Sequence, residues 1–178
     1  MFYVFLAEGF EEIEALTPVD ILRRAGIEVK TVGVTGKSVR GSHGILVSAD
    51  LEFADWNDAN PEALILPGGM PGTRNLGASQ KLCELLVSQK NTALICAICA
   101  APSVLGKLGL LNGKKAICFP GFEQELLGAQ VQPVGVVTDG NIITGKGAGV
   151  AAEFAFAIVE KVKGKQEAEA LRNTMCYQ

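Results

Sequence analysis

The sequence predicts an α/β domain built on a mostly parallel sheet, and two observations lead to this prediction. Short apolar runs recur along the chain, as strands buried on both faces of a parallel sheet require. Between them lie longer stretches with helical periodicity, and strands that alternate with helices form parallel sheets. The 178 residues contain no internal repeat and no linker, so we expect a single domain over 1–178.

The first helix carries an ambiguity. The run FYVFLA predicts a buried strand at 2–7, and the periodic stretch after it predicts a helix at 11–25. Pro18 interrupts that stretch, and two arrangements accommodate it. Either Thr17 caps a helix whose first residue is Pro18, or the helix begins near Glu11 and adapts around the proline.

The remaining elements follow from apolar runs, turn residues and amphipathic spacing. In chain order they are a strand at 28–34, a hairpin at 38–50, a strand at 63–69, a helix at 78–89, a strand at 92–98, a short helix at 100–109, a strand at 115–119, a hairpin at 134–145 and helices at 149–164 and 165–173. The pair Asp139-Gly140 is typical of the turn in such a hairpin.

Composition narrows the class of protein. Apolar residues make up 48% and charged residues 20%, which is typical of a compact folded chain. The net charge of -3, with Lys and Arg scattered, argues against a nucleic-acid partner, because phosphate binding needs a basic surface. The uncharged stretch 91–106 falls short of the roughly 20 residues of a membrane span and contains Pro102.

The expected location is cytoplasmic. The N-terminal segment MFYVFLAEGF lacks the basic region and the long apolar stretch of a secretory signal. The five cysteines are odd in number and irregularly spaced, which favours reduced thiols over a disulfide framework.

Cys99 is the strongest candidate for chemistry. It stands between the strand at 92–98 and the helix at 100–109, whose first turn carries small residues and Pro102. A sharp turn there would lift the side chain above the sheet, as in a nucleophile elbow. Unpaired N–H groups and the positive end of the helix dipole would favour the thiolate. The alternative is a buried structural cysteine.

Cys96 has C-x-x-C spacing to Cys99, but we do not expect the two to pair. In an extended strand three residues span about 10 Å, whereas a disulfide needs Cα atoms within about 7 Å. Cys96 would also point to the opposite face of the strand from Cys99. A packed core thiol is therefore the better interpretation of Cys96.

Two other strand ends could complete a site, because chemistry in parallel sheets lies at the carboxyl edge. Gly68 and Gly69 would let backbone N–H groups approach an anion, as an oxyanion hole requires, although an ordinary turn explains them equally well. In EGFEEIEAL, one of Glu11, Glu12 and Glu14 could be a buried, partly protonated acid, but their spacing does not select it. Acidic residues at a helix start are also ordinary dipole partners.

Two further motifs argue against a nucleotide and a metal. The stretch GKGAGVAAE (145–153) lacks the hydroxyl residue of a phosphate-binding loop and is misplaced for a dinucleotide fingerprint, so a tight turn at a helix start explains it. A single histidine and dispersed cysteines give no metal-ligand spacing. We therefore expect no cofactor and no metal.

Four blocks of the sequence resemble, in order and spacing, the DJ-one (ThiJ/PfpI) superfamily. They are AEGFEEIEALTPVDILRRAGIEV, LILPGGMPGTRNL, ICAICAAPSVL and GAGVAAEFAFAIVE. The resemblance extends over essentially the whole chain. It is closest to the branch that holds the parkinsonism-associated protein and its bacterial relatives.

The resemblance implies a flavodoxin-like fold and a homodimer packed partly through the first helix. It makes Cys99 the elbow cysteine and Glu14 the carboxyl group that hydrogen-bonds the sulfur. It also assigns the backbone N–H groups of Gly69 and Ala100 to the oxyanion hole.

This chain departs from the family pattern at two positions. The peptidase branch has a histidine directly after the cysteine, where this chain has Ala100, so proteolysis is not expected. The parkinsonism-associated protein has a histidine before a proline where this chain has Phe119. The single histidine, His43, falls where relatives place a polar residue near the pocket, and it either assists there or lies solvated on the hairpin.

The function expected from these features is that of a cysteine-dependent stress protein acting on reactive carbonyls, a glyoxalase- or deglycase-type enzyme. Cys99 would add to an aldehyde, and Glu14 would move the proton. The alternative is a redox sensor or chaperone in which Cys99 is oxidised to sulfinic acid without efficient catalysis.

Overall fold

A seven-stranded sheet forms the centre of the molecule in the computed structural model, which describes residues 1–177. Its strands are β1 (Phe2–Leu6), β2 (Val29–Gly33), β5 (Leu51–Glu52), β6 (Ala63–Leu66), β7 (Leu94–Ile98), β10 (Val136–Asp139) and β11 (Ile142–Gly145). Their spatial order is β10-β11-β7-β6-β1-β2-β5, and every pair is parallel except β10 with β11. The predicted α/β class is confirmed.

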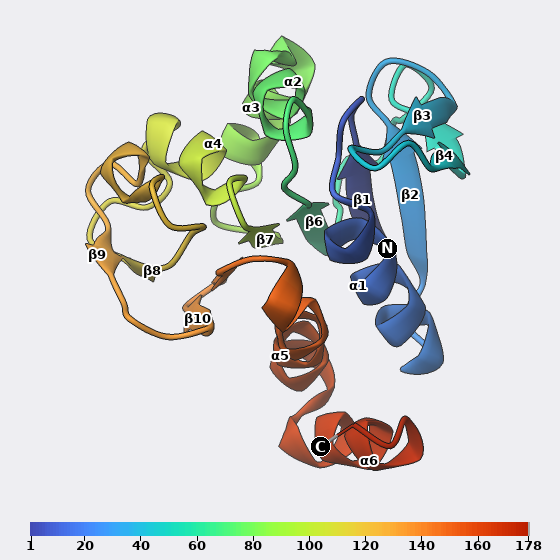
Figure 1. Cartoon of the computed structure of the whole chain (residues 1–178), viewed down its shortest axis with the longest axis vertical. Helices are drawn as coiled ribbons and strands as arrows, with labels where there is room; N and C mark the ends of the chain where they lie inside the picture. Colours follow the sequence, from blue (N-terminus) through green and yellow to red (C-terminus); the bar gives the residue numbers. More distant parts are fainter. Residues whose placement is uncertain (178) are drawn as a thin grey trace.

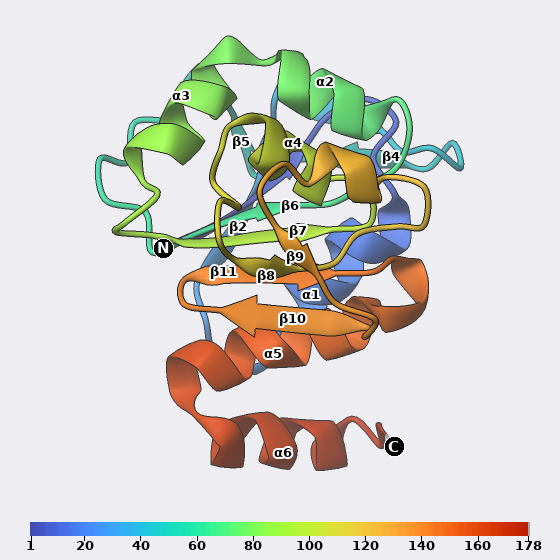
Figure 2. The same ribbon diagram turned by 90° about the vertical axis from the view of Figure 1, so that its left-hand side faces the viewer.

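Helices cover both faces of this sheet. On one face lie α1 (Glu12–Arg24) and α5 (Ala151–Lys163), with α6 (Lys165–Thr174) packed outside α5. On the other face lie α2 (Gly72–Ala78), α3 (Gln80–Ser88) and α4 (Pro102–Lys107), as the two views in Figures 1 and 2 show.

The core follows the two faces because strand side chains alternate. Along β1, Phe2, Val4 and Leu6 belong to the cluster under α1 and α5, whereas Tyr3 and Phe5 belong to the cluster under the other helices. Burying both faces of a strand requires a continuous apolar run, which is what the sequence supplies at these positions.

The structure resolves the ambiguity of the first helix. α1 begins at Glu12 and runs through Pro18, which is buried inside it. The proline removes one helical hydrogen bond, because a residue at position 18 would otherwise donate its N–H to the carbonyl of Glu14. Packing of the buried face against α5 and the sheet maintains the helix despite this loss.

Two predictions were wrong in detail. The strand predicted at 115–119 is only β8 (Lys115–Ala116), which pairs with β9 (Gln130–Val131) outside the main sheet. After β8 the backbone N–H of Ile117 donates to the side chain of Thr144, at Oγ1 and 2.9 Å, instead of to the backbone of a neighbouring strand. The helix α2 was missed altogether.

The hairpin predicted at 38–50 is present as β3 (Ser38–Arg40) and β4 (Leu46–Ser48), a separate two-stranded sheet. It lies beside the first turn of α1, where Phe10 bridges to Gly41.

None of the helices within residues 1–177 is long and apolar enough to span a membrane.

Candidate functional site

Cys99 lies on a sharp turn immediately after β7. Its φ of 64° is left-handed, a conformation that is uncommon for residues other than glycine and that clusters at functional sites. The turn is held on both sides of the residue: the N–H of Cys99 donates to the carbonyl of Gly145 at 2.9 Å, and the carbonyl of Cys99 accepts from the N–H of Phe119 at 2.8 Å.

This turn also corrects the expected direction of the side chain. Cys96 is fully buried, as expected, in the core cluster under α1 and α5. Cys99 is partly buried and packs against that same cluster, not on the opposite face of the sheet. The strict alternation of a strand does not extend to Cys99, because the residue lies beyond the end of β7 and its own backbone is left-handed.

Two backbone N–H groups face the sulfur of Cys99. They belong to Gly69, at the end of the turn after β6, and to Ala100. Gly69 has a φ of 88°, and a Cβ atom there would lie only 2.4 Å from the backbone nitrogen of Glu11, so glycine is required. Because α4 begins at Pro102 and not at residue 100, the Ala100 donor belongs to the turn that precedes the helix.

Glu14 is the carboxyl group beside the thiol. Its side chain is hydrogen-bonded to Cys99, and the residue is only 1% exposed. Its Oε2 accepts from the N–H of Gly68 at 2.9 Å, and the N–H of Ala148 also donates to the carboxylate. A Cβ atom on Gly68 would lie 2.6 Å from both Cys99 Cβ and Glu14 Oε2, so the close approach of the three residues depends on this glycine.

Burial sets the protonation of this pair. It raises the pKa of Glu14 to about 7, although the hydrogen bonds from Cys99, Gly68 and Ala148 oppose the shift. Burial also raises the pKa of Cys99 to about 12, with the charge and hydrogen bond of Glu14 adding to the shift, while the N–H groups of Gly69 and Ala100 oppose it. Burial and the neighbouring carboxyl group therefore oppose the thiolate, which the N–H groups of Gly69 and Ala100 favour.

Phe119 lies at the same edge of the sheet. Its backbone bond to Cys99 holds it next to the elbow, and its side chain is 47% exposed. A Cβ atom built on Gly147 would be 3.3 Å from the Phe119 ring and 4.0 Å from Glu14 Oε1. A half-exposed aromatic side chain therefore lies close to the elbow and to the buried carboxyl group.

His43 is part of a different cluster. Its Nδ1 lies 3.0 Å from Glu12 Oε2 and 3.3 Å from Glu11 Oε2, and the side chain is 69% exposed. The Glu12 hydrogen bond, followed by the charges of Glu11 and Glu12, raises the pKa of His43. The contacts of this imidazole among residues 1–177 are to these carboxylates and to Ser42 Oγ at 3.2 Å, so the structure gives it no contact with Cys99.

The same cluster is the one place where the described residues offer ligand atoms for a metal. Atoms of Glu11, Glu12 and His43 lie within 4.8 Å of one another. Spacing could not indicate this group, because the histidine is far from the two carboxylates in the sequence. The ion pairs of His43 account for the arrangement without an ion.

Comparison with known protein families matches most of the chain. A family model described as "DJ-1/PfpI family" matches residues 2–161, which include Cys99, Glu14 and Phe119. This chain belongs to the DJ-1/PfpI family.

Individual relatives of the DJ-1/PfpI family extend the match to nearly the whole chain. The protein dj-1beta of Drosophila melanogaster is 39% identical over 93% of this chain and 91% of its own length. A Caenorhabditis elegans protein named glutathione-independent glyoxalase DJR-1.2 is 33% identical over 95% of this chain and 91% of its own. The structure described as oxidized DJ-1 of Toxoplasma gondii matches with a TM-score of 0.94 at 35% identity, covering 99% of this chain and 97% of that one.

The site contains a group that sequence reasoning missed. The stretch GKGAGVAAE was interpreted only as a turn before a helix, yet it carries Gly147 beside Phe119 and the Ala148 N–H that donates to Glu14. The signal was present as a glycine pair at the end of β11, the neighbour of β7 in the sheet. Adjacent parallel strands end at the same edge, so their turns meet.

Proposed function

We propose that this protein acts on small reactive carbonyls through Cys99, as a glyoxalase- or deglycase-type enzyme. One observation carries the proposal: the partly buried thiol is surrounded by a carboxyl group with a pKa of about 7 and by two N–H donors. A nucleophile, an acid–base group and an oxyanion hole are the groups that such chemistry needs. The relative named as a glutathione-independent glyoxalase supports the same class.

The first step of the mechanism couples attack to proton transfer. The pKa of Cys99 is raised to about 12, so the thiol is protonated near neutral pH, and the Glu14 carboxylate takes its proton as the sulfur attacks. A C–S bond forms to the aldehyde carbon, and the carbonyl π electrons move to oxygen. The N–H groups of Gly69 and Ala100 stabilise that oxyanion, and Glu14 then returns the proton to give a hemithioacetal.

The second step moves a proton between carbons. With methylglyoxal as substrate, the Glu14 carboxylate removes the proton from the carbon bonded to sulfur while the ketone oxygen is protonated, which gives an enediol. Glu14 then delivers its proton to the former ketone carbon as the hydroxyl on the sulfur-bearing carbon loses its proton and becomes a carbonyl. The product is a lactoyl thioester of Cys99, which water hydrolyses to lactate and free thiol. The overall reaction is methylglyoxal plus water to lactate, with no oxidant and no cofactor. A base with a pKa of about 7 exists in both protonation states at neutral pH, as this exchange requires.

The test is methylglyoxal consumption with lactate detection in amine-free buffer. We expect turnover by the wild-type protein, none above background for Cys99→Ser, and unchanged turnover for the control Cys176→Ser, whose thiol is exposed on the C-terminal segment. Wild-type protein no faster than Cys99→Ser would refute the proposal.

A second candidate function is oxidation sensing, favoured by the donors that face the sulfur. Peroxide would oxidise Cys99 to sulfinate, and the N–H groups of Gly69 and Ala100 could then bind the anionic product. The relative whose structure is described as oxidized fits this chemistry. Intact mass after mild peroxide should show oxygen added first at Cys99. Prior oxidation of Cys176 would count against it.

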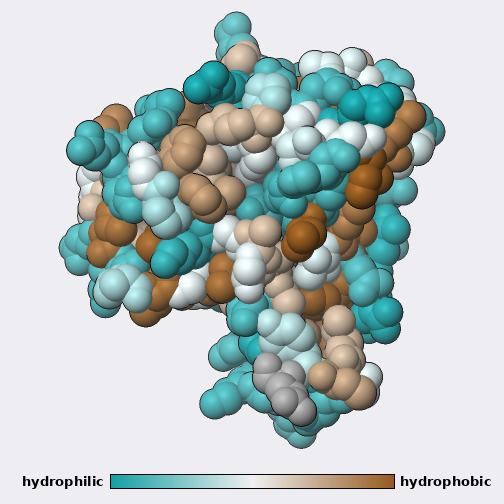
Figure 3. All heavy atoms as spheres, in the orientation of Figure 1, coloured by the Kyte–Doolittle hydropathy of each residue, from teal (hydrophilic) through white to brown (hydrophobic). Residues whose placement is uncertain are grey.

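A homodimer is part of the proposal. The resemblance implies one packed through the first helix, and large apolar side chains are exposed there: Ile13 on α1, and Ile45 and Leu46 on the adjacent hairpin. Figure 3 shows apolar side chains gathered over this region of α1 and the hairpin. We expect Ile13→Glu to convert a dimer to a monomer in sedimentation analysis, with Val87→Glu, a similarly exposed change on α3, as the control. A wild-type monomer would exclude the dimer.

Five free thiols agree with the proposed cytoplasmic location.

A further inference from the structure

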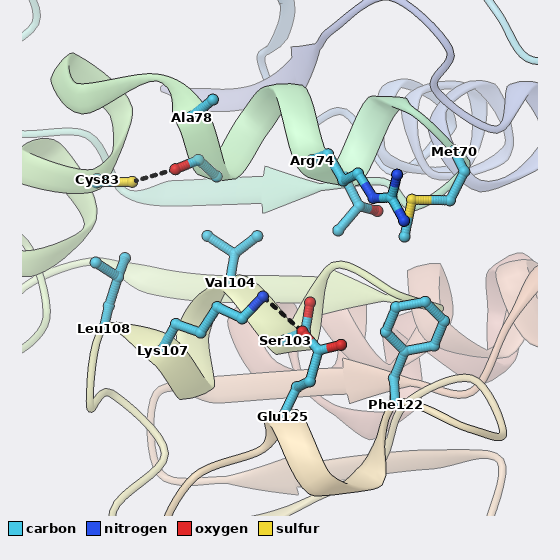
Figure 4. A pocket seen from close by; sticks show the side chains of 12 residues that line it. Met70, Arg74, Ala78, Cys83, Ser103, Val104, Lys107, Leu108, Phe122 and Glu125 are labelled. Carbon is cyan, nitrogen blue, oxygen red and sulfur yellow. Dashed lines mark hydrogen bonds and ion pairs between the residues drawn. The ribbon is translucent and has the colours of Figure 1, made fainter.

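A cavity of about 370 Å³ lies between α2, α3, α4 and the short helix η1 (Glu123–Glu125) (Figure 4). Its lining comes from Met70, Thr73, Arg74, Gly77, Ala78, Cys83, Ser103, Val104, Lys107, Leu108, Phe122 and Glu125. Neither Cys99 nor Glu14 contributes to it, so the cavity is separate from the candidate active site. Its volume falls within the range of about 300 to 1,000 Å³ that small-molecule sites occupy.

One polar group in the wall lacks a partner. Thr73 lines the cavity and is 3% exposed, yet its Oγ1 makes no hydrogen bond to any of residues 1–177. Buried hydroxyl groups are nearly always paired, because leaving one unpaired forfeits its bond to water. An oxygen atom of a bound molecule would supply the missing partner.

The charges around the cavity favour an anion. Lys107 pairs with Glu125 at 2.6 Å, so these two charges balance. Arg74 lies next to Thr73 on α2 and makes no ion pair with any of residues 1–177. Figure 4 shows Arg74 and Met70 along the α2 side, across from Phe122 and Glu125. One positive charge is therefore left over on the rim.

The rest of the lining is apolar. Val104 and Leu108 come from α4 and the residue after it, and Phe122 and Met70 lie on either side of the opening in Figure 4. These side chains suit a compact hydrocarbon or aromatic group, whose burial is driven by the hydrophobic effect.

We propose that this cavity binds a small organic oxyanion. Arg74 pairs with its anionic group, the Thr73 hydroxyl donates a hydrogen bond to it, and its apolar body packs against Val104, Leu108 and Phe122. A carboxylate and a phosphate monoester share this chemistry. The site goes beyond the proposed carbonyl chemistry and does not depend on it.

The test is a titration of the full chain, followed by amide NMR shifts of α2 and α4, with three probes that share a phenyl body. Benzoate and phenyl phosphate carry the two kinds of oxyanion, and benzamide is the uncharged control. We expect one or both anions to bind with a saturable shift and benzamide to bind at least about tenfold more weakly, because it loses the charge-assisted bond.

Variants assign the binding to this cavity. Arg74→Gln should weaken anion binding by about tenfold or more, and Thr73→Val, which removes only the hydroxyl, by about threefold to tenfold. Thr73→Ser should retain the wild-type affinity. Arg24→Gln on α1 removes an exposed arginine on the other face and should change nothing. Cys99→Ser should also bind normally, which separates this site from the candidate active site.

Three results would overturn the proposal. They are no saturable binding of either anion, benzamide binding as tightly as the anions, and unchanged affinity in Arg74→Gln. Arg74 is exposed, so its variant is expected to fold even where Thr73→Val does not. The Arg74 result alone is therefore decisive.

Discussion

Glu12 and Glu14 lie on the same turn of α1 and both expose little surface to solvent, yet the pKa of Glu12 is lowered and that of Glu14 is raised. Burial would raise the pKa of Glu12, but hydrogen bonds from the His43 side chain and from three backbone N–H groups outweigh it and lower the pKa. Burial raises the pKa of Glu14 to about 7 in spite of its partners.

The difference comes from depth as well as from partners: Glu14 lies deeper in the protein than Glu12, and only Glu12 is hydrogen-bonded to a histidine. Glu12 is bonded to the ring and the backbone N–H of His43, which lower its pKa, and it ties the hairpin to α1. The partners of Glu14 are neutral N–H groups and a thiol, so its proton is free to exchange near neutral pH. Two positions in the first turn of one helix therefore provide an anchor and a candidate acid–base group.

The largest expected effect is a loss of methylglyoxal turnover when Glu14 is replaced but not when Glu12 is replaced. Glu14→Gln should lower the turnover of methylglyoxal by a factor of about 100 or more, because the amide cannot carry the proton. Glu12→Gln should leave kcat within about threefold of the wild type, since general acid–base catalysis is not removed. Lactate assays on both variants test this, with alkylation of Cys99 to verify that the thiol remains. Equal losses in the two variants would break the distinction.

The second effect is a pH dependence of stability. The native Glu14 has a pKa of about 7 against an ordinary value of 4.5, so the folded state retains a proton that the unfolded chain releases in between. Stability should therefore fall as the pH rises from 4.5 to 7, by on the order of 3 kcal/mol, and Glu14→Gln should abolish that fall. Urea unfolding of both proteins across this window is the measurement. Parallel curves for the two would contradict it.

The third effect is a loss of stability as the pH falls, whereas the effect of Glu14 is a loss as the pH rises. Because the pKa of Glu12 is lowered, its contribution is present above pH 4.5 and is lost as the pH falls below that value. At pH 6, Glu12→Gln should destabilise the protein by about 1 to 3 kcal/mol, since the charge-assisted bonds to His43 and the hairpin are lost. Glu14→Gln at the same pH should cost less. Denaturation midpoints compared at pH 6 decide the order.

The smallest effect belongs to the exposed partner. His43→Asn should destabilise the protein less than Glu12→Gln does, because ion pairs at the surface contribute little to stability. The raised pKa of His43 means that the pair is present below pH 6.5 and is lost as the pH rises above it. Thermal unfolding at pH 6 and pH 9, at low and high salt, should show the loss only at pH 6 and low salt. A larger loss at pH 9 would be inconsistent with this pair.

Most of the fold could be predicted because strands buried on both faces leave continuous apolar runs in the sequence. The helix α2 could not, since Gly72 and Gly77 make its seven residues poor helix formers. Its start is instead tied to a turn far away in the sequence, because the N–H of Gly72 donates to the carbonyl of Gly9. Such bonds depend on tertiary structure, which local sequence does not contain.

The candidate site was predictable in part for a similar reason. The small residues after Cys99 indicated a turn, but not that its left-handed φ would redirect the thiol toward Glu14. Spacing could not choose among the three glutamates, because the choice depends on which turn each one faces: Glu14 faces Gly68, and Glu12 faces the hairpin. The resemblance to a family pointed to Glu14, and the residues alone did not.

Residue 119 is attached to the elbow through its main chain: its N–H donates to the carbonyl of Cys99, and the preceding segment is tied to Thr144. The side chain takes no part in either bond. The side chain at this position can therefore be substituted while the backbone bond is kept. Any residue with an N–H can place a new functional group beside the thiol without displacing Cys99. Replacing the aromatic ring by an imidazole would add a second base, so that selection or engineering could retune the chemistry at one codon.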